Sequence, residues 1–335
     1  MNYTEEERAI VYLNFCTQLD YREKVALLRK SVKEGFIESK QQKEETDKLV
    51  ALLDSKNYFA VTLASSDYPE ALKAIDEAPL VLLGAGNREL LSKRKFCIVG
   101  SRKTPSWAEG VARRISEELS ERFAIVTGLA EGGDRAAIEG ALKSGNLISV
   151  LPCGLDECYP ASHFSLKEKI RESGLLLSEY PLKEKARTYS FHARNRILAG
   201  LSEGVLIVSA GERSGTSITA GKALDYGRDV FALPYNVGVT QGAGCNALIK
   251  KGASLVTDSE DILSFYGFEK RAKAQVKLSE EEQKVLEVLQ EAGELHTAVI
   301  AERTGLKIYE ATAALSSLEM KNLAVKAGGN RYSAL

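Results

Sequence analysis

The sequence predicts an α/β protein: a Rossmann-like, doubly wound and mainly parallel sheet, with a small N-terminal helical domain and a C-terminal winged helix. Two observations predict the sheet. Apolar runs rich in β-branched residues recur between Phe96 and Asp258, and helix-patterned segments lie between most of them. Strands that are apolar on both faces and alternate with helices are typical of a parallel sheet covered on both sides. A third observation, helical periodicity before and after this region, predicts the flanking domains.

Composition limits the class of protein. The chain has 335 residues, which is long for one core and favours two or three domains. It holds no apolar run of about 18 residues, so we expect no membrane span, and MNYTEEERAI lacks the apolar core of an export signal. Five widely spaced cysteines and three histidines argue against a disulfide framework or a metal cluster. We therefore expect free thiols, a cytoplasmic location, no metal and no cofactor.

The N-terminal segment, residues 1–60, is expected to form a helical domain. YLNFCTQLDYREKVALLRKSVKEGF has apolar residues at mixed spacings of three and four, which predicts a helix with Gly35 as its stop. The charged run SKQQKEETDKLVALLDSK begins a second helix. The stretch SSDYPEALKAIDEAPLVLLGAGN then predicts a short helix and a short strand.

The central domain, residues 61–268, carries the predicted parallel strands. These are the runs FCIVGS, FAIVTG, LISVLP, LLLSEY, VLIVSA, DVFALP and SLVTD. Helices are expected at SWAEGVARRISEELSERF and DRAAIEGALKSG. The polar stretch EKRAKAQVK near residue 270 predicts a linker to the last domain.

The C-terminal domain, residues 275–335, is expected to be a winged helix. Ser279 and Glu282 form a capping-box pattern before an apolar-periodic helix. A short helix with a TGL turn, a third helix and a hairpin with a GGN turn complete the pattern. The domain carries 7 basic and 9 acidic residues, which is unusual for a domain that reads duplex DNA.

Small polar residues and glycines follow three of the predicted strands, at the edge where an open parallel sheet binds its ligands. They are Gly100, Ser101 and Arg102, then Gly128, and then Ser214, Gly215 and Thr216 before a helix. Glycines let a backbone approach a ligand closely, and helix N-termini attract anions. Arg194 and Arg196 lie in a stretch, residues 185–202, with four basic residues and no acid. The pattern predicts an anion site within a chain of net charge −1.

Each of these features also has a purely structural interpretation. The glycines fit turns, the arginines fit surface ion pairs, and Phe191 and Tyr159 fit either a core or a surface on which bases stack. Asp134 is explained better as a helix N-cap than as a catalytic acid. The convergence of the features on one edge of the sheet favours the site.

The nucleotide motifs are absent. GSRKTP follows the first strand in place of GxGxxG, and the spacing from Gly215 to Lys222 does not fit a Walker motif. The three histidines have no evident serine or cysteine partner, so we expect no catalysis. A phosphate site that lacks nucleotide motifs and has Phe191 beside its arginines favours a single-stranded nucleic acid.

Eight ordered motifs then resemble the DprA/Smf DNA-processing family. They are VGSR, TGLAEGGDRAAIEGAL, VLPCGLDECYP, LLSEYPL, FHARNRILAGLS, RSGTSITAGKAL, GRDVFALP and NALIKKGASLVTD, and DYPEALKAIDEAPLVLLGAGN upstream fits as well. The resemblance covers about residues 60–265. The helices before it, interpreted as a SAM-like domain, and the winged helix after it resemble the flanking domains of that family.

The resemblance implies a non-enzymatic, cytoplasmic protein that binds single-stranded DNA, dimerises through the Rossmann-like domain and helps load the RecA recombinase on incoming strands in natural transformation. By motif match, the family's DNA pocket falls on twelve residues. They are Gly100, Ser101, Arg102, Gly128, Arg187, Phe191, Arg194, Asn195, Arg196, Ser214, Gly215 and Thr216. Because Arg194 and Arg196 alternate, we expect one of them to face DNA and the other to fix the loop.

The chain departs from the family pattern at several positions, among them His192 in place of a common proline and Tyr235 where Pro-Gly is typical. Glu131 stands where the family usually has arginine, Ile138 where it has histidine, and Ala193 where arginine is common. An added acid and a lost base should weaken DNA binding if either faces the strand.

Two other functions remain open from sequence. A nucleoside-monophosphate phosphoribohydrolase of the LOG type shares the broad fold, but Thr219 stands where its catalytic glutamate would be. A transcriptional regulator would use the winged helix on duplex DNA, but the third helix, YEATAALSSLEMKN, carries little positive charge.

Overall fold

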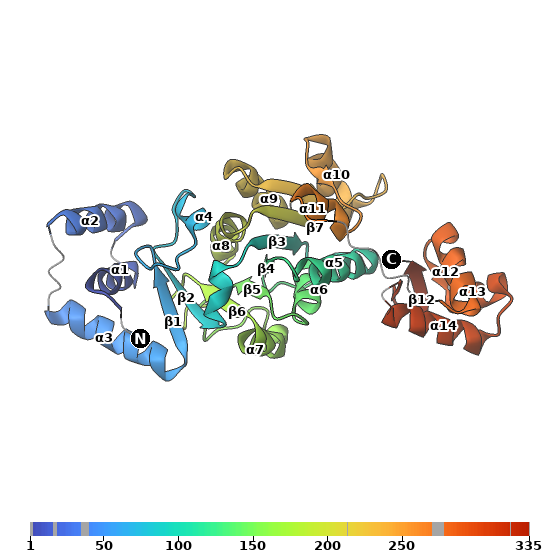
Figure 1. Cartoon of the computed structure of the whole chain (residues 1–335), viewed down its shortest axis with the longest axis horizontal. Coiled ribbons are helices and arrows are strands. Elements are labelled where there is room, and N and C mark those ends of the chain that lie inside the picture. The colour runs from blue at the N-terminus through green and yellow to red at the C-terminus, as the bar shows by residue number, and fades with distance from the viewer. Residues whose placement is uncertain are drawn as a thin grey trace.

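The structure is a computed structural model that describes residues 3–15, 19–34, 40–212, 214–269, 278–321 and 323–334. Figure 1 shows three regions in a row: N-terminal helices, a central sheet with helices on its two faces, and a C-terminal winged helix. The predicted α/β class is therefore confirmed. Among the described residues, no helix is both long and apolar enough to cross a bilayer.

The central sheet has the strand order β1-β2-β6-β5-β4-β3-β7-β8-β9. The pairs from β6 through to β9 are parallel, whereas β1 and β2 extend the sheet with antiparallel pairing. The strands are β1 Tyr58–Thr62, β2 Val81–Gly86, β3 Lys95–Gly100, β4 Ala124–Thr127, β5 Leu147–Val150, β6 Leu175–Ser178, β7 Gly204–Ser209, β8 Asp229–Ala232 and β9 Ser254–Leu255. All seven predicted strands are present.

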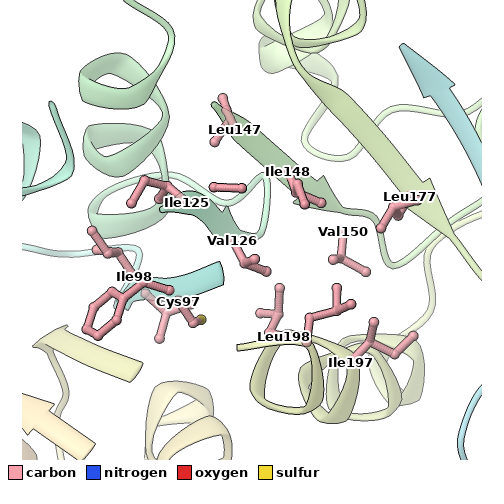
Figure 2. Close-up of a cluster of buried hydrophobic side chains, with 14 of the residues drawn as sticks. Cys97, Ile98, Ile125, Val126, Leu147, Ile148, Val150, Leu177, Ile197 and Leu198 are labelled. Atoms are coloured by element: carbon pink, nitrogen blue, oxygen red, sulfur yellow. The ribbon is translucent and has the colours of Figure 1, made fainter. Parts of the chain in front are cut away.

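The strands of the central sheet are apolar because helices cover both faces. Every residue of β3, β4, β5, β6 and β7 is buried. Figure 2 shows how Ile197 and Leu198 of α8 point at Val126 and Val150 of the sheet. Burial of each such side chain stabilises the fold by about 1.5–3 kcal/mol before the loss of chain entropy is counted.

Helices α5 Ser106–Leu119, α6 Gly133–Ala141 and α7 Phe164–Ser173 connect β3 to β6 and cover one face. Helices α8 Thr188–Leu201 and α9 Gly215–Asp225 pack together on the other face (Figure 1). The remaining helices of this region are α4 Glu70–Lys73, α10 Ala243–Lys250 and α11 Ser259–Phe265, with short 3₁₀ turns η1 Arg88–Ser92, η2 Ala161–His163 and η3 Thr240–Gly242.

The N-terminal region differs from its prediction in two places. The segment expected to form one helix is two, α1 Glu5–Phe15 and α2 Tyr21–Glu34, before α3 Lys40–Ser55. Asp20 and Glu23 exchange backbone-to-side-chain hydrogen bonds of 2.8 Å, and this capping box starts α2. The expected stop at Gly35 lies outside the described residues.

The second difference is β1, which the sequence interpretation placed in the helical domain. All five residues of this strand are buried, and the strand pairs in full with β2. The boundary expected between residues 60 and 61 therefore falls inside a strand of the sheet. The sequence of β1, YFAVT, is a run of five apolar or β-branched residues, which is typical of a buried strand.

The winged helix forms as predicted. Its elements are α12 Glu280–Ala292, β10 Leu295–His296, α13 Thr297–Thr304, α14 Ile308–Met320, β11 Ala324–Lys326 and β12 Arg331–Ala334. Ser279 and Glu282 make the expected capping box, with bonds of 2.7 and 3.2 Å. The three helices and the small sheet enclose their own apolar core.

Candidate functional site

A pocket of about 720 Å³ opens at the carboxyl edge of the sheet, between β3 and β7. From β3 the chain proceeds through β4 and β5 on one side, whereas β8 and β9 follow β7 on the other. Such a reversal of strand order leaves a crevice where α/β proteins bind ligands. We call this the switch-point pocket. Its lining is Val99, Gly100, Ser101, Arg102, Lys103, Ala130, Asp134, Thr188, Phe191, His192, Arg194, Asn195, Leu198, Gly211, Ser214, Gly215, Thr216, Thr219, Thr240 and Gln241.

Glycines bring the end of β3 and the start of α6 into direct contact. A Cβ on Gly133 would lie 2.5 Å from the Cα of Gly100, and one on Gly100 would lie 2.8 Å from the Cα of Gly133. Gly132, at φ +75°, lies against the carbonyl of Ser101. These positions need glycine because any side chain would separate the helix from the strand. The close approach places the first turn of α6 beside the pocket.

Asp134 fixes the loops beneath the pocket. Its carboxylate accepts hydrogen bonds from the N–H groups of Gly100 at 3.3 Å and Ala130 at 3.4 Å. The N-cap of α6 is Gly132, so the expected N-cap role of Asp134 is wrong. Asp134 instead joins the ends of β3 and β4. Burial raises the pKa of Asp134, against the opposing effect of the Arg194 charge.

Arg194 is buried at the base of the pocket, with 4% of its surface exposed. Nη1 donates to the carbonyl of Val150 and Nε to Asn195 Oδ1. Burial lowers the pKa of Arg194 and Asp134 raises it again, and the group keeps its proton at neutral pH. Its nitrogens bind the protein itself, so Arg194 fixes the loop, as one arginine of this segment was expected to do.

Gly128 leaves room for these two buried charges. A Cβ there would lie 2.3 Å from Asp134 Oδ2 and 2.5 Å from Arg194 Nη1. Gly128 does not line the pocket, although it was predicted as a binding residue. Because Gly128 has no side chain, the side chains of Asp134 and Arg194 can pack directly against its backbone.

Asn195, in the middle of α8, and Ser214 both support the first turn of α9. Asn195 Nδ2 donates to the carbonyl of Gly215 at 3.3 Å. Ser214 is the N-cap of α9 and accepts from the N–H of Thr216 at 3.2 Å. A Cβ on Gly215 would meet nothing within 4 Å, so the backbone there faces open space in the pocket. This helix N-terminus favours an anion.

Arg102 and Lys103 are exposed on the loop after β3 and supply positive charge at the mouth of the pocket. The guanidinium of Arg102 lies 5.2 Å from the centre of the Phe191 ring and 5.6 Å from that of Tyr159. Among the residues that the structure describes, no carboxylate forms an ion pair with Arg102. Its charge is therefore available to a ligand.

Two predicted site arginines lie outside the pocket lining. Arg196 pairs with Glu179 at 2.6 Å, and only 13% and 16% of the two side chains are exposed. Arg187 is exposed at the start of α8 and pairs with Glu184 at 3.1 Å. The expectation that Arg196 joins Arg102 in one anion site is wrong, because a helix turns about 100° per residue and directs Arg196 away from Phe191 and Asn195.

The structure thus brings nine of the twelve predicted residues to the pocket: Gly100, Ser101, Arg102, Phe191, Arg194, Asn195, Ser214, Gly215 and Thr216. Sequence reasoning missed Lys103, Thr188 and His192, which adjoin predicted residues, and their positions next to VGSR and on the same face of α8 were the available signal. It also missed Thr240 and Gln241. They reach the pocket from η3, far along the chain, and no motif marks them.

The chemistry of the pocket suits anion binding. Its lining carries three permanent cations, Arg102, Lys103 and Arg194, against one acid, Asp134. The described residues contain no cluster of side chains suited to a metal ion. Burial raises the pKa of the Cys97 thiol and raises that of Cys153 to about 11. Neither thiol is therefore a thiolate at neutral pH.

Two family models match most of the chain. Residues 59–267 match the model of DNA recombination-mediator protein A. The chain belongs to that family. Residues 269–330 match the DprA winged helix domain, which confirms the resemblance seen in the sequence motifs.

Relatives of this recombination-mediator family cover much of the chain. DNA processing protein DprA of Streptococcus pneumoniae is 40% identical over 202 residues, 60% of this chain and 72% of that protein. Protein Smf of Escherichia coli is 37% identical over 281 residues, 80% of this chain and 75% of that protein.

Solved structures agree with this family. The crystal structure of DNA processing protein A from Streptococcus pneumoniae covers 81% of this chain and 100% of its own, with a TM-score of 0.69 and 32% identity. The Helicobacter pylori protein, solved to show its single-stranded DNA binding mode, covers 62% of this chain and 95% of its own, with a TM-score of 0.57 and 30% identity.

Proposed function

We propose that this chain binds single-stranded DNA at the switch-point pocket and acts in recombination without catalysing a reaction. Arg102 and Lys103 take backbone phosphates at the mouth, and the N-terminus of α9 beside Gly215 takes another. Phe191 supplies an apolar ring on the same wall. The family membership and the Helicobacter pylori relative support the ligand class.

The observation that carries this proposal is the environment of Arg102. Aromatic rings rather than carboxylates surround the guanidinium, so its charge is not neutralised within the protein. A cation presented this way at a pocket with no nucleotide motif suits a phosphate chain, and single strands are bound by combined cations and rings.

The test compares Arg102→Ala with Arg122→Ala. Both arginines are exposed and lie over an aromatic ring, but Arg122, 5.7 Å from Phe268, precedes β4 at the opposite edge of the sheet. We expect R102A to weaken binding of oligo-dT about tenfold, because a charge-assisted contact is lost. The slope of log affinity against log salt should also fall by about 0.7. Fluorescence anisotropy measures both quantities.

R122A should bind as the unchanged chain does. Equal losses in the two variants would show a general charge effect and contradict the pocket assignment. No binding of oligo-dT by the unchanged chain at low salt would remove the proposed function altogether.

We also propose, from the family resemblance, that the chain helps load RecA recombinase on DNA in the cytoplasm as a homodimer through its Rossmann-like domain. The cations at the mouth of the pocket support this role, because contacts to phosphates bind a strand without reading its sequence. Sedimentation equilibrium tests the dimer, and a single-chain mass at micromolar concentration would contradict it.

The phosphoribohydrolase alternative gains no support from the site. Thr219, at the position of the missing glutamate, is 1% exposed at the pocket wall. Asp134 is the acidic residue in the pocket lining, and its carboxylate accepts hydrogen bonds from two backbone N–H groups. Release of free base from nucleoside monophosphates by the pure chain would revive this alternative.

A further inference from the structure

Tyr159 contacts Arg102 from outside the switch-point pocket. It lies in the loop after β5, and its ring centre is 5.6 Å from the Arg102 guanidinium. It also meets Phe191 edge-to-face, with ring centres 5.2 Å apart and planes at 73°. Phe191 lines the pocket and Tyr159 does not. Tyr159, which is 41% exposed, therefore lies beside the mouth of the pocket and in contact with its cation.

The loop that carries Tyr159 is held firmly. Backbone bonds of 2.8 Å join Gly154 to Glu184 and Asp156 to Leu182, in the segment that leads into α8. The buried Lys167 donates to the carbonyls of Leu155 and Glu157. These contacts fix the Tyr159 loop against α7 and against the segment before α8, the helix of Phe191. The edge-to-face contact of the two rings then joins the loop to that helix.

Arg102, in contrast, has no such support of its own. It lies in an exposed turn, and its guanidinium makes no ion pair within the described part of the chain. A free arginine side chain loses rotamer entropy when it is fixed on a ligand. A cation held against two ring faces has lost part of that freedom before the ligand arrives.

We propose that Tyr159 is a positioning residue, which with Phe191 holds the Arg102 guanidinium at the mouth of the pocket, ready for a DNA phosphate. This inference rests on the proposed single-strand binding. It assigns Tyr159 no direct contact with DNA, so its whole effect on affinity passes through Arg102.

A double-mutant cycle tests the proposal, with oligo-dT affinity measured by fluorescence anisotropy on the full chain. We expect Tyr159→Leu to weaken binding about threefold to tenfold, and Tyr159→Phe, which keeps the ring, to restore most of that affinity. In the R102A background, Y159L should have no further effect, because the group on which it acts is gone.

The matched control is Tyr309→Leu in the winged helix. Tyr309 is exposed, and the centre of its ring lies 5.8 Å from Lys307 Nζ. This variant should bind as the unchanged chain does. If Y159L weakens binding by the same factor with and without Arg102, Tyr159 contacts DNA directly and the proposal is overturned. The proposed function would survive that result, whereas absence of binding by the unchanged chain would end both.

A second variant covers the case in which Y159L does not fold. Arg102→Lys keeps the charge but lacks the planar guanidinium that stacks on rings. We expect R102K to lose affinity about as much as Y159L, threefold to tenfold. Unchanged affinity of R102K would show that the ring contacts do not matter for binding and would also overturn the proposal.

Discussion

The surroundings of each guanidinium decide what the arginine does in this protein. Arg194 is sealed beneath the pocket and binds the Val150 carbonyl, Arg196 is neutralised by Glu179, and Arg102 lies against aromatic rings. From the sequence, all three were expected at one edge of the sheet, with either Arg194 or Arg196 facing DNA and the other fixing the loop. The structure separates them into a buried support, an ion pair and a cation available to a ligand.

Glu131 allows a prediction at this scale. It is exposed in the loop that carries Ala130 to the pocket, so its charge repels a bound phosphate. We expect Glu131→Ala to raise oligo-dT affinity about twofold to fivefold at low salt, with the gain shrinking as salt screens the charge. Anisotropy titrations at two salt concentrations measure this.

The control for this prediction is Glu172→Ala. Glu172 is exposed near the C-terminal end of α7, at the opposite edge of the sheet. An equal gain in E172A would mean that net charge, and not the position of Glu131, governs binding.

Element packing, more than helix propensity, builds the site. Gly100 and Gly133 join β3 to α6, and Asn195 joins α8 to α9. A pocket wall made from elements so far apart in the chain depends on these few contacts.

In the winged helix, Glu282 joins elements in the same way. Its carboxylate accepts a hydrogen bond of 2.6 Å from Lys321 and another from Ser317 of α14.

Glu282 gives the winged helix a predictable pH dependence. The hydrogen bonds from Lys321 and Ser317 lower the pKa of Glu282 to about 2. A carboxyl whose pKa is lower in the folded state stabilises the fold above its unfolded pKa of about 4.3, and this contribution is lost as the pH falls toward 2. We expect Glu282→Gln to lower the melting temperature at pH 7.

Calorimetry of the full chain at pH 7, 4 and 3 checks this expectation. The difference between the unchanged chain and E282Q should shrink as the pH falls, because protonation removes the same ion pair that the substitution removes. A difference that stays constant with pH would show that Glu282 contributes by packing and not by charge.

The whole molecule combines a local cationic site with a net charge of −1. The winged helix does not add positive charge, and its α14 presents Ile308 and Tyr309 at 60% and 62% exposure. The exposed cations at the mouth of the pocket, Arg102 and Lys103, supply positive charge for a polyanion, and we expect the mediator role to require strand binding there.

The proposed RecA role is tested on the full chain. We expect the chain to speed RecA ATPase activity on single strands coated with single-strand-binding protein, because a held strand is opened for RecA. R102A should lose most of this effect and R122A should keep it. Equal stimulation by R102A and the unchanged chain would separate the RecA role from the pocket.

The sequence by itself determined the α/β class, every predicted parallel strand and the winged helix, because burial on both faces and helical periodicity leave local patterns. It also placed nine site residues at the pocket, since strand ends in a parallel sheet meet at one edge. It could not show that Arg196 turns toward Glu179 or that the strand-like run YFAVT pairs with β2. Only the tertiary structure decided these points, and brought Tyr159 and Gln241 to the site, because they depend on contacts between segments far apart in the chain.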